Sequence, residues 1–475
     1  MPIAFENTYN SYTEDDTTMN FLIDYPTTTS GLEPYKLLLP LALILILAKV
    51  FSLILSKAKF PQVIGFLISG LVVGAIGFIP NQSILTTNTM DGLSYFSKVG
   101  VVLILFTAGV ETDIKKVKSE GLASIVITSL GVIVPLIFGF LVSFLFRTYG
   151  GLDTSFLGEG INPIYSDIFY GVILSATSVS ITVATLKELG RLDTKVGTAL
   201  VSAAILDDII GIILLSLVIS LANGSKTGQG DDFVSMIMQA SGSTSATLNI
   251  ALIIIFMLAF FGLTFGLGFV VKKVFNYLGT KYPHHIRITI LSLGLCFLWS
   301  YLAEYFNIAD ITGAYLMGLI FAGTKPAEYI DHRAETTNNY IFAPVFFACI
   351  AMEMYQTKFD STFIAFLGFG IAWVVAGLLG KVVGAGTGSL IMKFKFKDSV
   401  KIGVGMMARA EVLIVCAQKG VEAGLVSSQI MPFTLILILL SSFMTPIFLK
   451  LLYKGEPPEK VELAKPAIEP VTASE

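Results

Sequence analysis

Long apolar runs alternate with short polar connections along almost the whole chain. About thirteen runs can be traced, and most approach the roughly 20 residues that a helix needs to cross a bilayer. They lie near residues 35–56, 62–79, 95–113, 121–146, 165–186, 196–221, 248–278, 286–304, 310–323, 339–356, 362–392, 400–418 and 427–452. A spanning segment must satisfy its own backbone hydrogen bonds, so the pattern predicts an all-α integral membrane protein of about 13 transmembrane helices.

Composition agrees with this interpretation. Of 475 residues, 54% are hydrophobic and 14% are charged, whereas soluble globular chains average about 25% charged residues. No basic tract of the kind that binds nucleic acid occurs, so we expect no nucleic-acid partner. The three cysteines lie in apolar runs and the three histidines in predicted connections, without metal-ligand spacing. We therefore expect no cofactor.

Lys and Arg are unevenly shared between successive connections. Every second connection is rich in them, as in residues 57–59, 115–118 and 393–401, while the connections between hold few. By the positive-inside rule, the basic connections face the cytosol of a cell membrane. Residues 1–34 then form an extracytoplasmic polar tail, residues 35–453 the transmembrane part, and residues 454–475 a short cytoplasmic tail.

The order of the runs suggests an internal duplication. Residues 105–109 of the third run resemble residues 345–349 of the tenth, and charges occur in the fifth and sixth runs and again in the eleventh and twelfth. With residues 248–278 as a joining helix, the halves would have opposite topology. Such inverted repeats are common in secondary transporters.

Four ionisable residues lie inside apolar runs: Asp207, Asp208, Lys381 and Glu411, with Arg409 beside the last. Each costs at least about 2.5–3.5 kcal/mol at the bilayer centre and is therefore a functional candidate. At 1.5 Å per residue, Asp207 and Lys381 both lie roughly 18 Å from the cytosolic ends of their runs. The same estimate brings Thr177, Ser178 and Glu411 to this level.

The two aspartates cannot face one partner equally, because neighbouring residues on a helix point about 100° apart. One can pair with Lys381 while the other faces a water-filled cavity. A carboxylate there can hold either a proton or a small cation, and competition between them is sufficient for exchange. Na+ favours carboxylate and hydroxyl oxygens, so Asp207, Asp208, Thr177 and Ser178 are its candidate ligands.

Structural interpretations remain open for each of these residues. The aspartates and Lys381 could form an ion pair that only stabilises the fold. Arg409 and Glu411 could form a structural or a gating salt bridge. Thr177 and Ser178 could donate to carbonyls of the preceding helical turn.

Several segments resemble the cation:proton antiporter superfamily, in the branch of NapA-type bacterial electrogenic sodium/proton antiporters. The resemblance runs nearly end to end, and the Asp-Asp pair followed by an intramembrane lysine is its most specific part. The segments that carry it are residues 61–65, 105–113, 176–182, 206–208, 380–381 and 405–412.

The resemblance implies a fold of two inverted repeats, with a core domain (about 121–221 and 362–453) and a dimerisation domain (about 35–113 and 248–356). It implies two crossing, discontinuous helices, here the fifth and twelfth runs, and a homodimer. Asp208 would carry cation and proton, and Asp207 would pair with Lys381. An elevator-like movement of the core domain would supply alternating access.

Three departures from the family pattern stand out. Ser180 and Ala410 occupy places where glycine is expected. In the tenth run relatives usually have glycine near Ala351, and Glu353 is unexplained. We also expect no nucleotide-binding regulatory domain of the kind found in glutathione-gated potassium efflux relatives, which tend to have Gln at the place of Asp207.

Four functions are compatible with mid-membrane carboxylates. Electrogenic Na+ (or Li+)/H+ exchange is the leading prediction, and K+/H+ exchange at the same site is its alternative. An intramembrane aspartyl protease needs two carboxylates on separate helices, which neighbours on one helix do not provide. A passive channel would pass current without proton countermovement.

Overall fold

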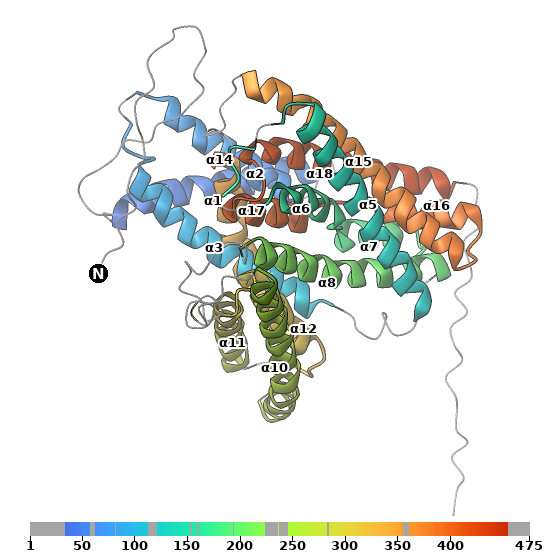
Figure 1. The fold of residues 1–475 in the computed structure, drawn as a ribbon. Coiled ribbons are helices and arrows are strands. Elements are labelled where there is room, and N and C mark those ends of the chain that lie inside the picture. Colours follow the sequence, from blue (N-terminus) through green and yellow to red (C-terminus); the bar gives the residue numbers. More distant parts are fainter. Residues whose placement is uncertain are drawn as a thin grey trace, which may run out of the picture.

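The structure is a computed structural model in which residues 34–57, 62–80, 82–112, 121–152, 154–158, 161–192, 194–223, 236, 246–282, 285–353, 355 and 361–454 are described. Every regular element in these residues is a helix (Figure 1). The all-α prediction is thus confirmed. The two predicted tails fall almost wholly outside the described residues.

The first half of the chain forms α1 (Pro34–Lys57), α2 (Gln62–Gly74), η1 (Ala75–Phe78), α3 (Thr87–Val110), α5 (Leu122–Tyr149), α6 (Pro163–Ser175), α7 (Val179–Glu188) and α8 (Lys195–Asn223). The second half forms α10 (Ala246–Lys281), α11 (Ile286–Tyr305), α12 (Asp310–Ala322), α13 (Ala327–Thr337), η2 (Asn338–Phe342), α14 (Ala343–Glu353), α15 (Ser361–Ile391), α16 (Phe396–Gly405), α17 (Glu411–Glu422), η4 (Ser428–Ile430) and α18 (Met431–Leu452).

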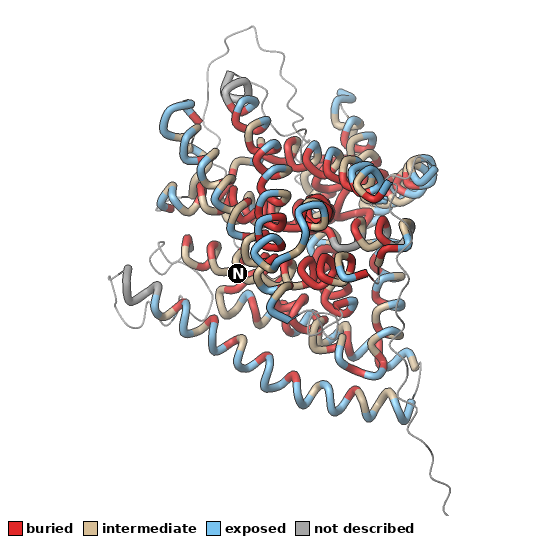
Figure 2. The backbone as a smooth tube through the Cα atoms, turned by 90° about the vertical axis from the view of Figure 1, so that its right-hand side faces the viewer, coloured by how far each residue is buried: buried red, intermediate tan, exposed pale blue. Residues whose placement is uncertain are grey.

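Within the described residues, 8 helices are long and apolar enough to cross a membrane, and two shorter apolar helices accompany them. The chain is therefore a multi-pass membrane protein. Many outward-facing side chains of these helices are apolar, as on α10, where Phe269 is 80% exposed. Buried residues gather in the middle of the molecule (Figure 2).

Two predicted spans are broken. The fifth run, 165–186, is divided into α6 and α7, with residues 176–178 outside any helix. The twelfth, 400–418, is divided into α16 and α17, with residues 406–410 between them. Each break releases backbone N–H and C=O groups that lipid cannot satisfy, so the protein must supply their partners.

The helices pack into two groups. The core group consists of α5–α8 and α15–α18, and the scaffold group of α1–α3 and α11–α14. In Figure 1 the core group lies to the right of α3 and α14, while α10, α11 and α12 extend below. The groups approach each other where α8 contacts α12, and α8 also contacts α10, which packs on α11 and α12.

Glycines allow unusually close approach inside each group. In the scaffold group, a Cβ on Gly318 of α12 would collide with the Phe106 carbonyl of α3. In the core group, a Cβ on Gly384 of α15 would collide with the Leu130 carbonyl of α5. Such backbone-to-backbone contact is a usual way to pack membrane helices. It fixes α15, and hence Lys381, against α5.

Candidate ion-binding site

Asp207 of α8 is held by two side chains from different segments. Its Oδ1 lies 2.5 Å from Nζ of Lys381 on α15, and both residues are completely buried. Its Oδ2 accepts a hydrogen bond of 2.5 Å from the Thr177 hydroxyl. Both oxygens of this carboxylate are therefore engaged by a cation and a hydroxyl.

Thr177 lies in the break between α6 and α7, which explains how it reaches α8. The hydroxyl donates to Asp207, so the alternative of a bond to the preceding helical turn does not hold for this residue. Ser178 follows it, and the backbone N–H of Ser178 donates to the Ala408 carbonyl at 2.9 Å. The two helix breaks thus contact each other directly.

Side chains from neighbouring helices satisfy the released backbone groups. The Thr182 hydroxyl of α7 donates to the carbonyl of Gly405, the last residue of α16, at 2.7 Å. On α18, Ser441 Oγ accepts from the Arg409 N–H at 3.1 Å, and Ser442 Oγ donates to the Arg409 carbonyl at 3.2 Å. These contacts allow irregular backbone to exist at membrane depth.

Arg409 is fully buried in the break between α16 and α17. Its Nη2 donates to the carbonyls of Leu174, at 2.6 Å, and Gly377, at 3.2 Å. Leu174 lies in the last turn of α6, where carbonyls lack intrahelical partners and where the helix dipole favours a cation. Arg409 therefore stabilises the end of a half-helix.

The predicted Arg409–Glu411 salt bridge stays a prediction. Glu411 is the first residue of α17, but its side chain lies outside the described residues, as does that of Glu353. The side chain of Ser180 likewise lies outside the described residues. Ala410 is the residue before α17 and has φ −152° and ψ −135°.

The surroundings of Asp208 differ from those of Asp207. Asp208 as a residue is partly exposed, with its Oδ1 buried, whereas Asp207 has no exposed surface. Asp208 lies within electrostatic range of Tyr315 of α12 and Cys416 of α17, and also of Lys381. The Tyr315 hydroxyl lies 3.3 Å from Thr112 Oγ1. Asp208 therefore lies on the side of α8 that faces the scaffold group, next to the broken helix α16–α17.

A second ion pair joins the two helix groups away from this site. Nζ of Lys419 on α17 lies 2.8 Å from Asp310 Oδ1 at the start of α12, and 3.3 Å from Glu422 Oε2. Glu304 completes the cluster by accepting from the Asp310 N–H at 3.2 Å. This cluster was not predicted, although Asp310, Lys419 and Glu422 all stand at the ends of apolar runs.

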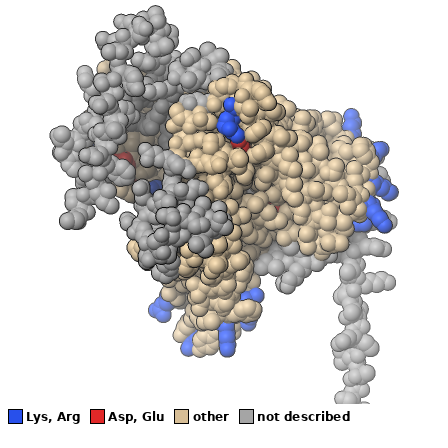
Figure 3. Space-filling model, viewed as in Figure 1, with Lys and Arg blue, Asp and Glu red and all other residues tan. Residues whose placement is uncertain are grey.

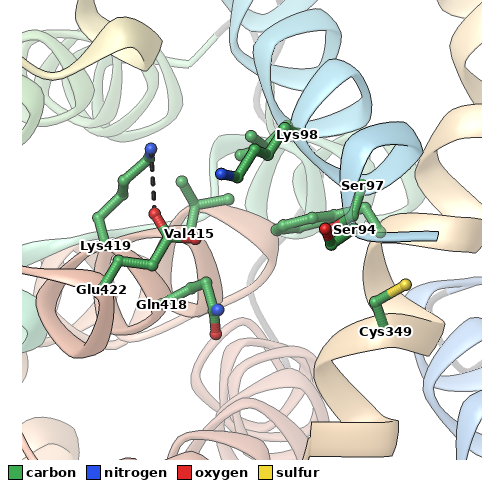
Figure 4. Close-up of a pocket in the computed structure, with 10 residues that line it drawn as sticks. Ser94, Ser97, Lys98, Cys349, Val415, Gln418, Lys419 and Glu422 are labelled. Carbon is green, nitrogen blue, oxygen red and sulfur yellow. Dashed lines mark ion pairs between the residues drawn. The ribbon is translucent and has the colours of Figure 1, made fainter. Parts of the chain in front are cut away.

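Beside this ion pair lies a cavity of about 40 Å³ between the two groups. Residues of α3 and α14 line one side and residues of α17 the other. Figure 4 shows Lys98 of α3 reaching toward α17, and the Lys419–Glu422 contact on the opposite wall. The boundary between the groups is thus loosely packed here.

No group of three or more His, Cys, Asp or Glu side chains in the described residues could hold a metal ion. A monovalent cation needs fewer charged ligands than that, since one carboxylate with hydroxyl or carbonyl oxygens can coordinate it. Asp208, next to the broken helix α16–α17, offers that chemistry, and such sites occur in transporters built with discontinuous helices.

Comparison with known proteins agrees with this geometry. The family described as "Sodium/hydrogen exchanger, transmembrane" matches residues 42–455. The "Probable Na(+)/H(+) antiporter GerT" of Bacillus cereus is 31% identical over 395 residues, covering 82% of this chain and 92% of that protein. The "Na(+)/H(+) antiporter" of Enterococcus hirae is 28% identical, covering 86% of this chain and 96% of that protein.

The fold has a counterpart among solved structures. The sodium proton antiporter MjNhaP1 from Methanocaldococcus jannaschii superposes with a TM-score of 0.60 at 18% identity, covering 89% of this chain and 99% of that one. At that identity the likeness concerns the fold alone. The resemblance to cation:proton antiporters is confirmed, and the chain belongs to the sodium/hydrogen exchanger family of membrane transporters.

Proposed function

We propose that the chain exchanges Na+ or Li+ for protons, with cation and proton competing for the carboxylate of Asp208. The observation that carries this proposal is that both carboxylate oxygens of Asp207 already have partners. Lys381 and Thr177 engage both of its oxygens, so Asp207 serves to fix charge and geometry. The carboxylate that can change its ligand is the partly exposed Asp208.

The names of two relatives support the proposed exchange of Na+ for protons. Those from Bacillus cereus and Enterococcus hirae are described as Na+/H+ antiporters. K+/H+ exchange at the same site is the second candidate, because another Bacillus cereus relative, 29% identical, is named "Na(+)/H(+)-K(+) antiporter GerN". The two cations present the same charge to Asp208 and differ in radius.

A proteoliposome assay separates the two candidates. With an inside-acid pH gradient reported by a fluorescent dye, Na+ and Li+ are expected to collapse the gradient at submillimolar to millimolar concentration. K+ at the same concentrations should leave most of the pH gradient in place. Collapse by K+ alone would overturn the sodium assignment. Electrogenic exchange needs a second proton per cation, which the Asp207–Lys381 pair would have to release. A membrane potential should then change the rate, because each charge is worth about 2.3 kcal/mol per 100 mV.

We further propose that access alternates by movement of the core group against the scaffold group. In this proposal the core group is the predicted core domain (121–221 and 362–453), and the scaffold group together with α10 is the predicted dimerisation domain (35–113 and 248–356). The boundary between them holds the Asp208 side of α8 and the Lys419–Asp310 ion pair. Two inverted repeats, a homodimer through the scaffold group, and an external N-terminus with a cytoplasmic C-terminus complete the proposal.

A covalent cross-link between the core group and the scaffold group should stop exchange. We expect that Asp310→Cys with Lys419→Cys, joined by a cleavable bifunctional thiol reagent, loses transport, because the ion pair spans the moving boundary. Cys296, Cys349 and Cys416 are buried and form no disulfide, and they would first be replaced by alanine. Transport should return when the reagent is cleaved.

The two single-cysteine variants treated in the same way are the matched controls and should remain active. If the doubly attached protein exchanges cations at the uncrosslinked rate, the relative movement of the groups is not needed. In that case the elevator proposal fails while the assignment of Asp208 stands.

A further inference from the structure

The turn between α15 and α16 carries alternating Lys and Phe residues at the end of a membrane span. The apolar span ends at Ile391, and residues 393–397 read Lys-Phe-Lys-Phe-Lys. All three lysines are exposed, and so is Phe396, at 71%. An exposed phenylalanine between lysines is costly in water but suits the boundary between headgroups and acyl chains.

Neighbouring segments add one exposed cation, Lys195, to this surface and two buried cations, Arg191 and Lys401, beneath it. Lys195, at the start of α8, has its Nζ 5.1 Å from the centre of the Phe394 ring. Arg191 and Lys401 both lie over the ring of Tyr453, with Cζ at 5.2 Å and Nζ at 4.4 Å from its centre. Residues from three distant parts of the sequence thus meet at one end of the core group.

Negative charge is scarce here. Among the described side chains of residues 189–198 and 391–405, the only carboxylate is Asp398, and it lies 3.2 Å from Lys401. Figure 3 shows Lys and Arg gathered at the right-hand edge of the molecule, where Figure 1 places α16, and again at the lower end of α10. A wide uncharged region lies between these clusters. The basic surface is therefore confined to the place where the span leaves the apolar layer.

We propose that this surface, formed by residues 393–397 with Lys195, binds the phosphate headgroup of an anionic phospholipid. The lysines would contact the phosphate while Phe396 and Ile391 contact the upper acyl chain. Basic clusters that directly follow a membrane helix attract anionic lipids, and each basic residue near the surface contributes about a five-fold gain in affinity. A soluble anion would use the lysines but would gain nothing from the exposed Phe396.

Native mass spectrometry of protein released from mixed phosphatidylglycerol and phosphatidylcholine tests this proposal. Wild type should retain phosphatidylglycerol in preference. The variant Lys393→Gln/Lys395→Gln/Lys397→Gln should lose that preference by about five-fold for each lysine removed. The matched control is Lys272→Gln/Lys273→Gln/Lys281→Gln, which removes the same charge from α10 in the other cluster and should keep most of the preference.

Three results would overturn the proposal: no lipid preference in wild type, equal losses in the two triple variants, or thermal stabilisation by inorganic phosphate equal to that by phosphatidylglycerol. The last would indicate a site for soluble anions. If the first triple variant does not fold, Lys395→Gln alone should lower the preference about five-fold, and an unchanged preference in it would equally overturn the proposal. The test does not depend on which cation the protein exchanges.

Discussion

In proteoliposomes that contain Asp208→Asn, Na+ and Li+ are expected to leave the pH gradient at the level of empty liposomes. Asparagine keeps the size of the side chain but can neither bind a proton at physiological pH nor balance the charge of a cation. The loss should therefore affect transport and leave folding almost unchanged, since Asp208 is partly exposed and is not the partner of Lys381.

The matched control is Asp91→Asn, the same chemical change at an exposed position of α3, which should exchange like wild type. Size-exclusion profiles and thermal unfolding in detergent should be the same for all three proteins. Exchange by Asp208→Asn at more than a small fraction of the wild-type rate would show that another group carries the cation.

Lys381→Ala is expected to destabilise the protein by about 3–5 kcal/mol, because it leaves the completely buried carboxylate of Asp207 without its cation. Replacing both partners should cost much less than replacing one. Asp207→Asn/Lys381→Met, which removes both charges and keeps most of the volume, is expected to recover most of the lost stability.

Thermal unfolding of the wild type, the single variants Asp207→Asn and Lys381→Met, and the double variant forms a double-mutant cycle that measures this coupling. Strong coupling supports a fixed ion pair. If Lys381→Ala and Lys381→Met are as stable as wild type, then Lys381 does not compensate Asp207, and the separation of roles between the two aspartates loses its basis.

Hydropathy predicted about thirteen spans, and 8 helices in the described residues are long and apolar enough to cross a membrane. Apolar runs locate such helices because lipid permits few alternatives to them. The joining helix was predicted at 248–278 and is observed as α10, Ala246–Lys281. The polar helix α13, which follows the short α12, was not predicted, since its sequence has no apolar run. The π-helix η2, which directly follows α13, could not be predicted from the composition of residues 338–342 either.

The breaks in the fifth and twelfth runs were expected from the family resemblance and not from hydropathy, which is continuous through both. Depth estimates correctly brought Thr177, Asp207 and Lys381 to one level, and the structure joins them. The partners of Arg409 could not be predicted, because they are backbone carbonyls of Leu174 and Gly377 whose position depends on how three helices pack.

The function of Asp208 as a shared site for cation and proton can be measured on purified protein in weakly buffered solution. Addition of Na+ should release protons in a saturable manner, and the apparent affinity for Na+ should fall by about ten-fold for each unit of pH below the pKa of the site. Asp208→Asn should release none. Saturable Na+ binding whose affinity is independent of pH, with no proton release, would contradict the account.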